Sequence, residues 1–307
     1  MRYRIHLQVL KTKMHIIFII ISLLLARCYK SNNNSIKLAT YQYATNDRVN
    51  NLEPLSVEME NTLNRKVTIH SYPTVDSLIK GITANEVDVA FINTLGYLTL
   101  FQEKQIMKPV ASFKIKEDAI NNYKSVLLSN NDSITRLVDI IDNAKNLSIS
   151  LVKKGSTSGN FIPRVLFKSL HLKSLEEEFK SVSYAGNHTA NFEKLLEKKV
   201  DLCTIGSNEY FKQIENDSTL KHQVKLVWIS GEIPLGPVLV NNNLEEIEKE
   251  KITRTLLQLH YNNVKAFERI KSGWSEAKQA DRFHHVSQEY YNAFFAQFNI
   301  GNDQEVF

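Results

Sequence analysis

Short apolar runs alternate with amphipathic stretches along most of the chain. The apolar runs predict strands at 36–41, 67–72, 87–92, 147–152, 179–184 and 200–205. The stretches between them predict helices at 49–64, 74–84, 159–171 and 188–198. The same order of elements therefore occurs twice. Strands that alternate with helices indicate βαβ units and parallel sheets, so the pattern predicts an α/β protein with two lobes.

Two segments flank the second set of elements and predict where the chain crosses between the lobes. They are 123–128 and 228–240, of which the second is rich in Gly and Pro. The helical stretch 244–272 then belongs to the first lobe. A last amphipathic helix is predicted at 283–298. Its aromatic stripe packs on a lobe or, as the alternative, on a second subunit.

The chain therefore divides into five predicted regions. They are a signal peptide (1–27), a tether (28–35), a first lobe (36–124 plus 237–282), a second lobe (125–236) and a C-terminal helical region (283–307). A chain of 307 residues is long enough to bury the cores of two such lobes.

The formal net charge of +5 is confined to the N-terminus. Residues 1–27 contain five basic residues and no acidic one, and the remainder contains 33 of each sign. Because the predicted lobes are formally neutral, the composition does not favour a nucleic-acid-binding protein.

The N-terminus has the pattern of an export signal. The apolar run 14–26 follows a basic stretch and is short for a membrane span of ~20 residues, whereas it suits a signal peptide. Cys28 follows LLAR in a pattern that resembles a bacterial lipobox, although Arg27 stands where a small residue is usual. Three hypotheses remain: a lipid anchor on Cys28, an uncleaved N-terminal anchor, and an ordinary cleaved signal. All three place the protein outside the cytoplasm.

One further cysteine, Cys203, lies in the predicted strand VDLCTI, where a buried apolar role is expected. If Cys28 is modified, no disulfide can form. His284 and His285 are adjacent, and no Cys/His spacing surrounds them. The sequence therefore predicts neither a metal site nor another cofactor.

Open α/β sheets bind ligands beyond the carboxyl ends of their strands. In this chain the segments at that edge contain Tyr43, Tyr72, 93–97, 156–159, 186–188 and 206–208. The tyrosines are either half-buried aromatics at strand ends or hydroxyl donors to a ligand.

The segment GSTSG, 155–159, belongs to this set and stands just before a predicted helix. A helix N-terminus presents unpaired N–H groups and a partial positive charge, so it favours anions. Hydroxyl groups donate and also accept, which suits an oxyanion that still carries a proton. His188, at the start of another predicted helix, either donates to the same anion or is a surface or capping residue. The segment predicts an anion site.

Other motifs do not fit this segment. A P-loop needs GxxxxGK[ST], but the chain continues from Gly155 as STSGN without a following Gly-Lys. A nucleophile elbow needs GxSxG, and its central position here is Thr157. A hydrolase built on Ser158 and His188 would also need an orienting acid, and none is evident.

Four segments together resemble the phosphate/phosphite/phosphonate-binding proteins of ABC transporters. They are EVDVAFINTLGY, GSTSGNFIPR, YAGNHTA followed by KKVDLCTIGS, and IPLGP, and the resemblance covers roughly 36–285. It implies the two-lobed type II periplasmic-binding-protein fold, an α/β fold with two crossings between the lobes.

The resemblance also implies the residues of the site. Ser156, Thr157 and Ser158 would hold the phosphorus oxyanion together with nearby backbone amides such as that of Gly159. The matching positions that also contact the ligand are those of His188, Tyr97 and Tyr43.

Two positions of the resemblance concern the substituent of the ligand. Family members that bind aminoethylphosphonate place carboxylates around the ammonium group, and the matching positions here are Asn208 and Gly236. Neither residue can neutralise an amine. The sequence therefore favours phosphite, phosphate or a small alkylphosphonate.

The predicted protein is thus an exported, lipid-anchored binding protein that captures a small phosphorus oxyanion and delivers it to an ABC permease in the membrane, without catalysis. A sensory module that uses the same cleft and an enzyme on the same fold are the alternatives.

Overall fold

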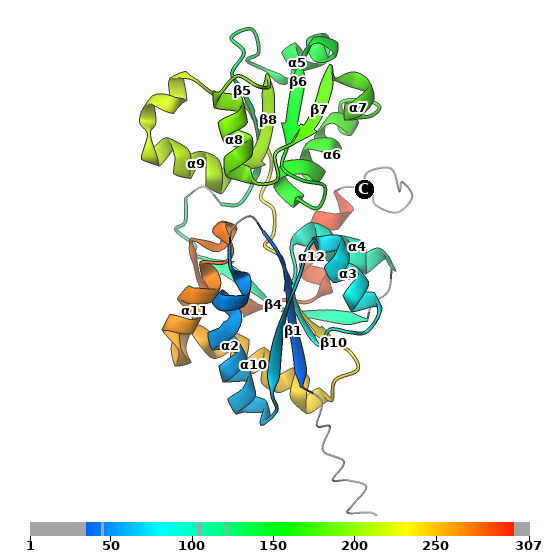
Figure 1. The fold of residues 1–307 in the computed structure, drawn as a ribbon, viewed down its shortest axis with the longest axis vertical. Helices are drawn as coiled ribbons and strands as arrows, with labels where there is room; N and C mark the ends of the chain where they lie inside the picture. The colour runs from blue at the N-terminus through cyan, green and yellow to red at the C-terminus, as the bar shows by residue number, and fades with distance from the viewer. Residues whose placement is uncertain (1–34, 44–45, 104–105, 121, 298–307) are drawn as a thin grey trace, which may run out of the picture. The chain divides into compact units, whose positions relative to one another are not determined.

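The computed structural model describes residues 35–43, 46–103, 106–120 and 122–297 (Figure 1). The predicted signal peptide, Cys28 and most of the tether lie outside these residues, as do 298–307 of the predicted C-terminal region. Within the described part of the chain, no helix combines the length and the apolar character that crossing a membrane requires.

The first lobe is built on a six-stranded sheet with the order β11-β4-β10-β3-β1-β2. Its strands are β1 (Ile36–Tyr41), β2 (Val67–Tyr72), β3 (Val89–Phe91), β4 (Met107–Ile115), β10 (Val238–Asn241) and β11 (Ala280–His285). β1 pairs in parallel with β2 and β3, whereas β10 is antiparallel to β3 and β4, and β11 is antiparallel to β4. The prediction of parallel pairing is confirmed for the βαβ part of this sheet only.

Helices cover both faces of this sheet. On one face lie α2 (Arg48–Leu63), α10 (Glu246–Asn262) and α11 (Val264–Lys271), and on the other α3 (Val75–Thr83), α4 (Thr94–Glu103) and α12 (Gln288–Ala296) (Figure 1). Successive strand residues point to opposite faces, so Leu38 packs with α2 and α10 while Ala39 packs with α3 and α4. This double burial explains why β1 is a nearly continuous apolar run.

The second lobe has a five-stranded sheet with the order β7-β6-β8-β5-β9. Its strands are β5 (Ser125–Ser129), β6 (Ser148–Leu151), β7 (Ser181–Tyr184), β8 (Leu202–Gly206) and β9 (Lys225–Ile229). β6 is parallel to β7 and β8, and β5 is antiparallel to β8 and β9.

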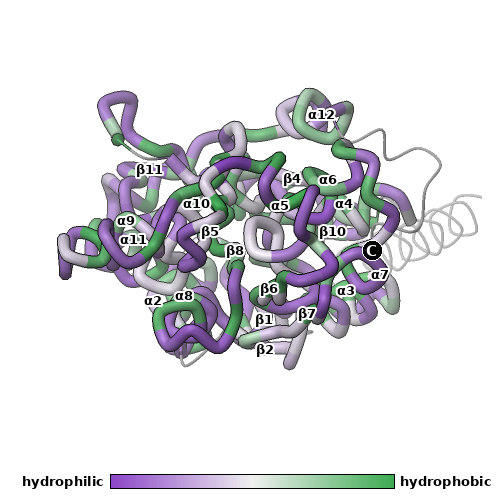
Figure 2. The backbone as a smooth tube through the Cα atoms, turned by 90° about the horizontal axis from the view of Figure 1, so that it is seen from above, coloured by the Kyte–Doolittle hydropathy of each residue, from purple (hydrophilic) through white to green (hydrophobic). Residues whose placement is uncertain are grey.

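Helical segments again lie on both faces of the sheet. They are α5 (Leu137–Asn143), η1 (Ala144–Asn146), η2 (Thr157–Phe161), α6 (Ile162–Ser169), α7 (Leu175–Glu178), α8 (His188–Leu196), α9 (Ser207–Asn216) and η3 (Ser218–His222). Cys203 is fully buried in β8, as the sequence predicts, and burial raises the pKa of its thiol. Seen from above, the outer loops are mainly hydrophilic and the apolar segments lie towards the strands (Figure 2).

The two crossings between the lobes differ in detail from the sequence prediction. Residues 125–128 of the first predicted crossing belong to β5, so the chain crosses between β4 and β5. The second crossing joins β9 to β10 through 230–237. The chain passes from one sheet to the other twice and therefore has two lobes with two crossings.

The C-terminal part also departs from prediction. Residues 283–285 continue strand β11, so the prediction of a helix from 283 is wrong at its start, and α12 begins at Gln288. The helical stretch 244–272 is two helices, because Asn263 caps α11 by accepting from the N–H of Ala266. A third short helix, η4 (Ser275–Ala277), precedes β11.

The aromatic stripe of α12 packs on the first lobe, as predicted. Tyr291 is fully buried, and its hydroxyl donates to the carbonyl of Leu235 at 2.8 Å. Phe294 and Phe295 are buried in the same core. The first lobe therefore takes up this stripe, which does not support the alternative of a dimer through α12.

Gly236, in the second crossing, is where the chain passes closest to another backbone. A Cβ at this position would lie 2.0 Å from the carbonyl oxygen of Ile92 and 2.6 Å from Cα of Asn93. Only glycine fits there, so the residue ties the crossing to the end of β3.

We expect Gly236→Ala to lower the free energy of unfolding by about 2 kcal/mol or more, because overpacked sites cost ~1–3 kcal/mol and here the clash is with backbone. Urea unfolding followed by circular dichroism measures it. Gly231→Ala is the matched control, because a Cβ at Gly231 would have no neighbour within 4 Å. Equal stability of the two variants would contradict the assignment.

Candidate functional site

The GSTSG segment begins a helix by capping it. Ser156 is the N-cap of η2, and its hydroxyl oxygen accepts from the backbone N–H of Gly159 at 3.1 Å. The N–H groups of Thr157 and Ser158 lie in the first turn, where a helix supplies no carbonyl partner. The capping role and the anion-site prediction are therefore compatible.

The turn is wider than an α-turn, and Pro163 provides the physical reason. The N–H of Phe161 donates to the carbonyl of Ser156, five residues earlier, at 3.0 Å. Pro163 has no N–H, so an α-helical bond to the carbonyl of Gly159 cannot form. That carbonyl instead accepts from the N–H of Val152 at 3.0 Å and from the hydroxyl of Thr204 at 2.9 Å. The two bonds tie the segment to β6 and β8.

Gly159 serves this close approach and does not line a cavity. A Cβ on Gly159 would lie 2.3 Å from Cγ2 of Val152. The structure therefore does not place Gly159 where the resemblance implied, at the ligand. Its role here is to let the turn pack on the end of β6.

The three hydroxyls of the segment point in different directions. That of Ser156 faces its own turn, and Oγ1 of Thr157 accepts from the N–H of Leu95, in the first lobe, at 3.1 Å. Ser158 is fully buried, and its hydroxyl accepts from that of Tyr123 at 2.9 Å. Only Ser156 and Thr157 line the cavity described next.

A small cavity, ≈ 30 Å³, lies between the two lobes at the carboxyl ends of β1, β3, β6 and β8. Its lining residues are Tyr41, Tyr43, Arg48, Asn93, Tyr123, Lys153, Gly155, Ser156, Thr157, His188, Asn208, Ser275 and Glu276. Five of the predicted site residues are therefore brought together: Tyr43, Ser156, Thr157, His188 and Asn208.

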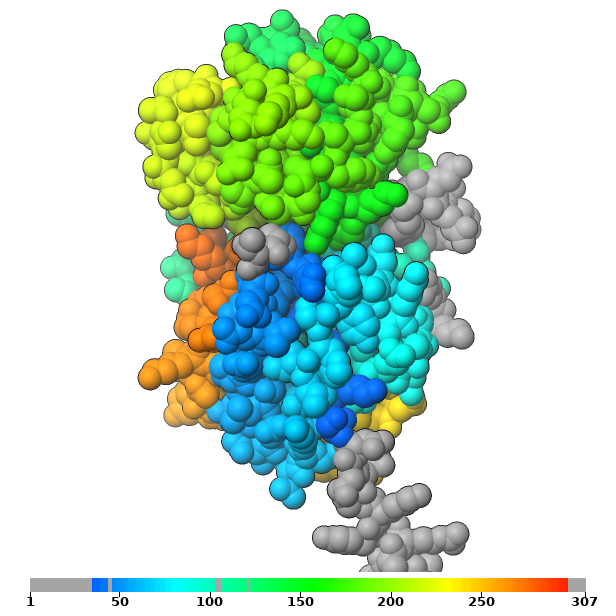
Figure 3. Space-filling model, viewed as in Figure 1, coloured from blue at the N-terminus to red at the C-terminus, as the bar shows by residue number. Residues whose placement is uncertain are grey.

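Hydrogen bonds from lobe to lobe close this cavity. Nδ2 of Asn93 donates to the carbonyl of Gly155 at 2.8 Å, beside the bond from Leu95 to Thr157. Nδ2 of Asn208 donates to the hydroxyl of Ser275 at 3.0 Å. On the face shown in Figure 3, atoms of the two lobes touch along part of their boundary. The small volume of the cavity is thus that of a closed cleft.

His188 presents a defined tautomer to the cavity. Its Nδ1 accepts from the backbone N–H of Gly206 at 3.0 Å, so the proton of the neutral ring is on Nε2. Burial lowers the pKa of the ring from 6.5 to about 4, against the attraction of the Glu209 carboxylate. The ring is therefore neutral near pH 7 and has one N–H to donate.

Tyr43 lies beside His188, and the centroids of the two rings are 6.0 Å apart. Burial raises the pKa of the Tyr43 hydroxyl well above its usual value, with Glu276 adding to the effect. The hydroxyl stays protonated and has its proton available for another acceptor.

Two cations that the sequence analysis missed, Arg48 and Lys153, line the cavity. Arg48 is the first residue of α2, and Lys153 lies two residues after the end of β6. Both stand at the carboxyl-end edge of a sheet, so their position was the available signal. Five further lining residues were not predicted as ligand contacts by any motif: Tyr41, Asn93, Tyr123, Ser275 and Glu276.

Tyr97 does not lie where the resemblance implied. Its ring packs against Tyr291 and Phe295 at centroid distances of 4.9 and 5.7 Å, within the core of the first lobe. It lines a different cavity, ≈ 730 Å³, between α10, β4 and the start of α12. The prediction that Tyr97 contacts the ligand is not supported by this placement.

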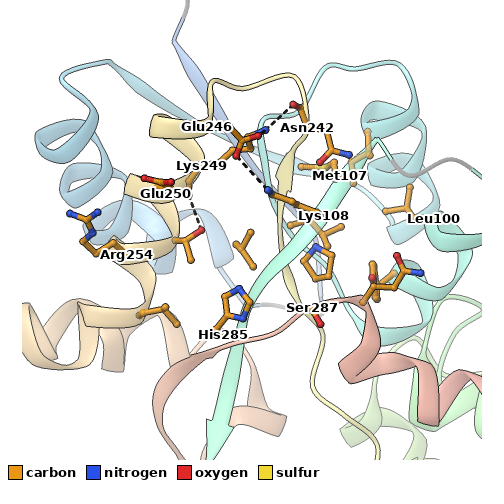
Figure 4. Close-up of a pocket in the computed structure, with 18 of the residues that line it drawn as sticks. Leu100, Met107, Lys108, Asn242, Glu246, Lys249, Glu250, Arg254, His285 and Ser287 are labelled. Carbon is orange, nitrogen blue, oxygen red and sulfur yellow. Dashed lines mark hydrogen bonds and ion pairs between the residues drawn. The ribbon is translucent and has the colours of Figure 1, made fainter.

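That larger cavity is a less suitable anion site. Figure 4 shows Lys108, Lys249 and Glu246 at its rim. The ammonium groups of Lys249 and Lys108 lie 2.5 and 3.8 Å from the carboxylate of Glu246, so these two cations are already paired. Arg254 shares the lining with a second carboxylate, that of Glu250, and no residue of the GSTSG segment lies there. The cleft between the lobes is the better candidate.

Comparisons with known proteins agree with this architecture. The family described as "ABC transporter, phosphonate, periplasmic substrate-binding protein" matches residues 40–291. The phosphonates-binding periplasmic protein of Escherichia coli K12 is 28% identical over 201 residues, which span 65% of this chain and 58% of that protein.

Two solved structures share the fold. One is a binding protein component of an ABC phosphonate transporter from Pseudomonas aeruginosa, with a TM-score of 0.66, 20% identity and coverage of 89% of this chain and 92% of that one. The other is PhnD1 of Prochlorococcus marinus in complex with methylphosphonate, with a TM-score of 0.68, 18% identity and coverage of 86% and 96%.

Because the pKa of His188 is lowered in the folded protein, the free energy of unfolding should depend on pH. The unfolded ring binds a proton below pH 6.5, whereas the folded ring does so only near pH 4. The stabilising contribution is thus complete above pH 6.5 and is lost as the pH falls towards 4, by up to roughly 3 kcal/mol. Urea unfolding between pH 7.5 and 4.5 measures the loss.

The matched variant is His188→Asn, whose amide oxygen can still accept from Gly206 but does not titrate. We expect its stability to fall less steeply with decreasing pH, by about 1 kcal/mol per pH unit. Parallel curves for the two proteins would contradict the buried, neutral ring.

Proposed function

Because the chain belongs to the family of periplasmic substrate-binding proteins of phosphonate ABC transporters, we propose that its inter-lobe cavity captures a small phosphorus oxyanion for uptake. The candidates are phosphite, phosphate and small phosphonates. One observation carries the proposal: three polar side chains of the cavity, those of Ser156, Thr157 and His188, already accept a backbone N–H and have a proton to donate to a ligand.

Three groups share this arrangement. Ser156 and Thr157 each accept a backbone N–H through the hydroxyl oxygen, and Nδ1 of His188 accepts another. The buried hydroxyl of Tyr43, which stays protonated, adds a fourth donor. A hydroxyl that accepts from the protein has its own proton free for the ligand, and so does Nε2 of His188. Four donors converging on one small cavity favour an anionic ligand with several acceptor oxygens.

The free energy of these hydrogen bonds is large enough for the affinity that capture of a ligand requires. Hydrogen bonds to a charged group contribute ~1.5–3 kcal/mol each. Four of them, less the cost of association, support micromolar binding or better. The electrostatics point in the same direction, because Arg48 and Lys153 outnumber the one carboxylate of the cavity, Glu276.

The arrangement does not favour the enzyme alternative. A hydrolase would need a hydroxyl activated by a base. Among the described residues, the hydroxyls of Ser156 and Thr157 accept from N–H groups, and neither is hydrogen-bonded to the ring of His188. We propose binding without bond cleavage.

The remaining parts of the proposal concern location and partners. Export by residues 1–27 and a lipid anchor on Cys28 would hold the protein at the outer face of a membrane, beside the ABC permease that receives the ligand. A sensory module using the same cleft is the second candidate. A permease and an ATPase encoded beside the gene would favour transport.

The ligand class is tested by thermal shift and calorimetry with phosphite, phosphate, methylphosphonate and sulfate. At ~100 Kd a ligand stabilises the folded protein by ~2.7 kcal/mol, which raises Tm by several degrees. We expect at least one phosphorus oxyanion to do so. If none of them shifts Tm or releases heat, the proposed function is wrong.

Thr157→Val removes one hydroxyl at nearly constant volume. We expect the affinity for the best oxyanion to fall by roughly 10- to 100-fold, because one hydrogen bond to a charged group is lost together with the bond from Leu95. Thr157→Ser should retain most of the affinity. Thr83→Val is the control, since that hydroxyl bonds within α3. Unchanged affinity in Thr157→Val would refute the role of this hydroxyl.

A further inference from the structure

Arg48 occupies a position among aromatic rings at the edge of the ligand cavity. Its guanidinium carbon lies 4.5 Å from the ring centroid of Tyr41, 4.5 Å from that of Trp274 and 5.2 Å from that of Tyr43. Nε donates to the carbonyl of Gly273 at 2.9 Å, and the residue is 3% exposed. Aromatic rings arranged around a cation are how proteins recognise ligands with an ammonium group. Here the protein's own guanidinium fills that position.

Lys153 approaches the same rings from the second lobe. Its Nζ lies 4.8 Å from the ring centroid of Tyr43 and 5.7 Å from that of Tyr41, and it donates to the carbonyl of Gln42 at 3.3 Å. Burial and the neighbouring charge of Arg48 lower the pKa of Lys153. Two cations from different lobes therefore line the cavity.

The charges of the cavity do not cancel. Glu276 is the one carboxylate that lines it. In the described part of the chain, no ion pair is formed by Arg48 or Lys153. Arg48 is buried and Lys153 partly buried, and a buried cation without an anion is costly. An anionic ligand would offset that cost, and an ammonium group would add a third cation to a cavity of ≈ 30 Å³.

The acceptors open to an ammonium group are few. They are the carboxylate of Glu276 and Oδ1 of Asn208, a buried atom without a hydrogen-bond partner. Both belong to the same small cavity as the two cations. Gly236, by contrast, packs against the backbone of Ile92 and does not line the cavity. Two cations thus line the cavity against the one carboxylate that could pair with an ammonium group.

We infer that Arg48 and Lys153 are specificity-determining residues, which restrict the site to phosphorus oxyanions whose substituent is neutral or anionic. A phosphonate that carries an ammonium group is rejected by their combined charge. The inference rests on the proposed function and adds to it the charge of the ligand's substituent.

Three ligands of similar size test the inference: ethylphosphonate, 2-aminoethylphosphonate and phosphonoacetate. Their substituents are neutral, cationic and anionic. By calorimetry on the full protein, we expect ethylphosphonate to bind on the order of 100-fold more tightly than 2-aminoethylphosphonate, from like-charge repulsion across a few ångströms. Phosphonoacetate should bind at least as tightly as ethylphosphonate. Equal affinity for the neutral and the cationic ligand would overturn the inference.

Substitutions at Arg48 and Lys153 test whether these two residues cause the preference for ethylphosphonate. In Lys153→Gln and Arg48→Gln the preference for ethylphosphonate over 2-aminoethylphosphonate should decrease by about 10-fold each, since one of two cations is lost. Arg48→Lys retains the charge and should retain the preference. Lys154→Gln is the matched control, because Lys154 is an exposed neighbour that does not line the cavity.

The outcomes are distinguishable. A preference that is unchanged in both Gln variants overturns the assignment to these cations, and if Arg48→Gln does not fold, Lys153→Gln carries the test. If the wild-type protein binds none of the three ligands and neither phosphate nor phosphite, the proposed function fails, and the inference fails with it. If it binds phosphonates without regard to charge, the inference alone fails.

Discussion

The orientation of three polar groups by backbone N–H donors is the constraint on which the proposed site depends. The oxygens of Ser156 and Thr157 and Nδ1 of His188 all accept from the main chain. A hydroxyl or a neutral imidazole can both donate and accept, so by itself it does not select the charge of a ligand. Once the backbone donates to the acceptor atom, the imidazole has only its proton to offer, and each hydroxyl has its proton free for the ligand. In the proposed site these protons favour an anion before any charged side chain is considered.

One of these three bonds depends on the closed arrangement of the lobes, and the others lie within the second lobe. Thr157 of the second lobe accepts from Leu95 of the first. Closure thus completes the set of donors, and a ligand that uses the donors would in turn favour closure. Binding and hinge motion are linked through this hydrogen bond in the proposed mechanism.

Much of this architecture was predictable because both faces of each sheet are buried. Strand β1 appears in the sequence as an apolar run for that reason, and the helices beside it show amphipathic periodicity. The predictions that the structure did not support also have physical explanations. Residues 283–285 continue a strand because β4 supplies an antiparallel partner from a distant part of the chain, a pairing that local periodicity does not encode. Tyr97 follows the loop after β3, but the turn of α4 carries its ring into the aromatic cluster of Tyr291 and Phe295.

The sequence by itself determined the repeat of elements and the position of GSTSG at a helix start beyond a strand, and hence the prediction of an anionic ligand. These features are local, because capping residues, strand ends and helix N-termini follow from neighbouring residues. Tertiary structure decided which hydroxyls face the cavity and placed two cations there. Arg48 and Lys153 are 105 positions apart in the sequence and come from different lobes. Their joint effect on a ligand's charge exists only when the lobes meet, since electrostatic repulsion depends on distance in space and not along the chain.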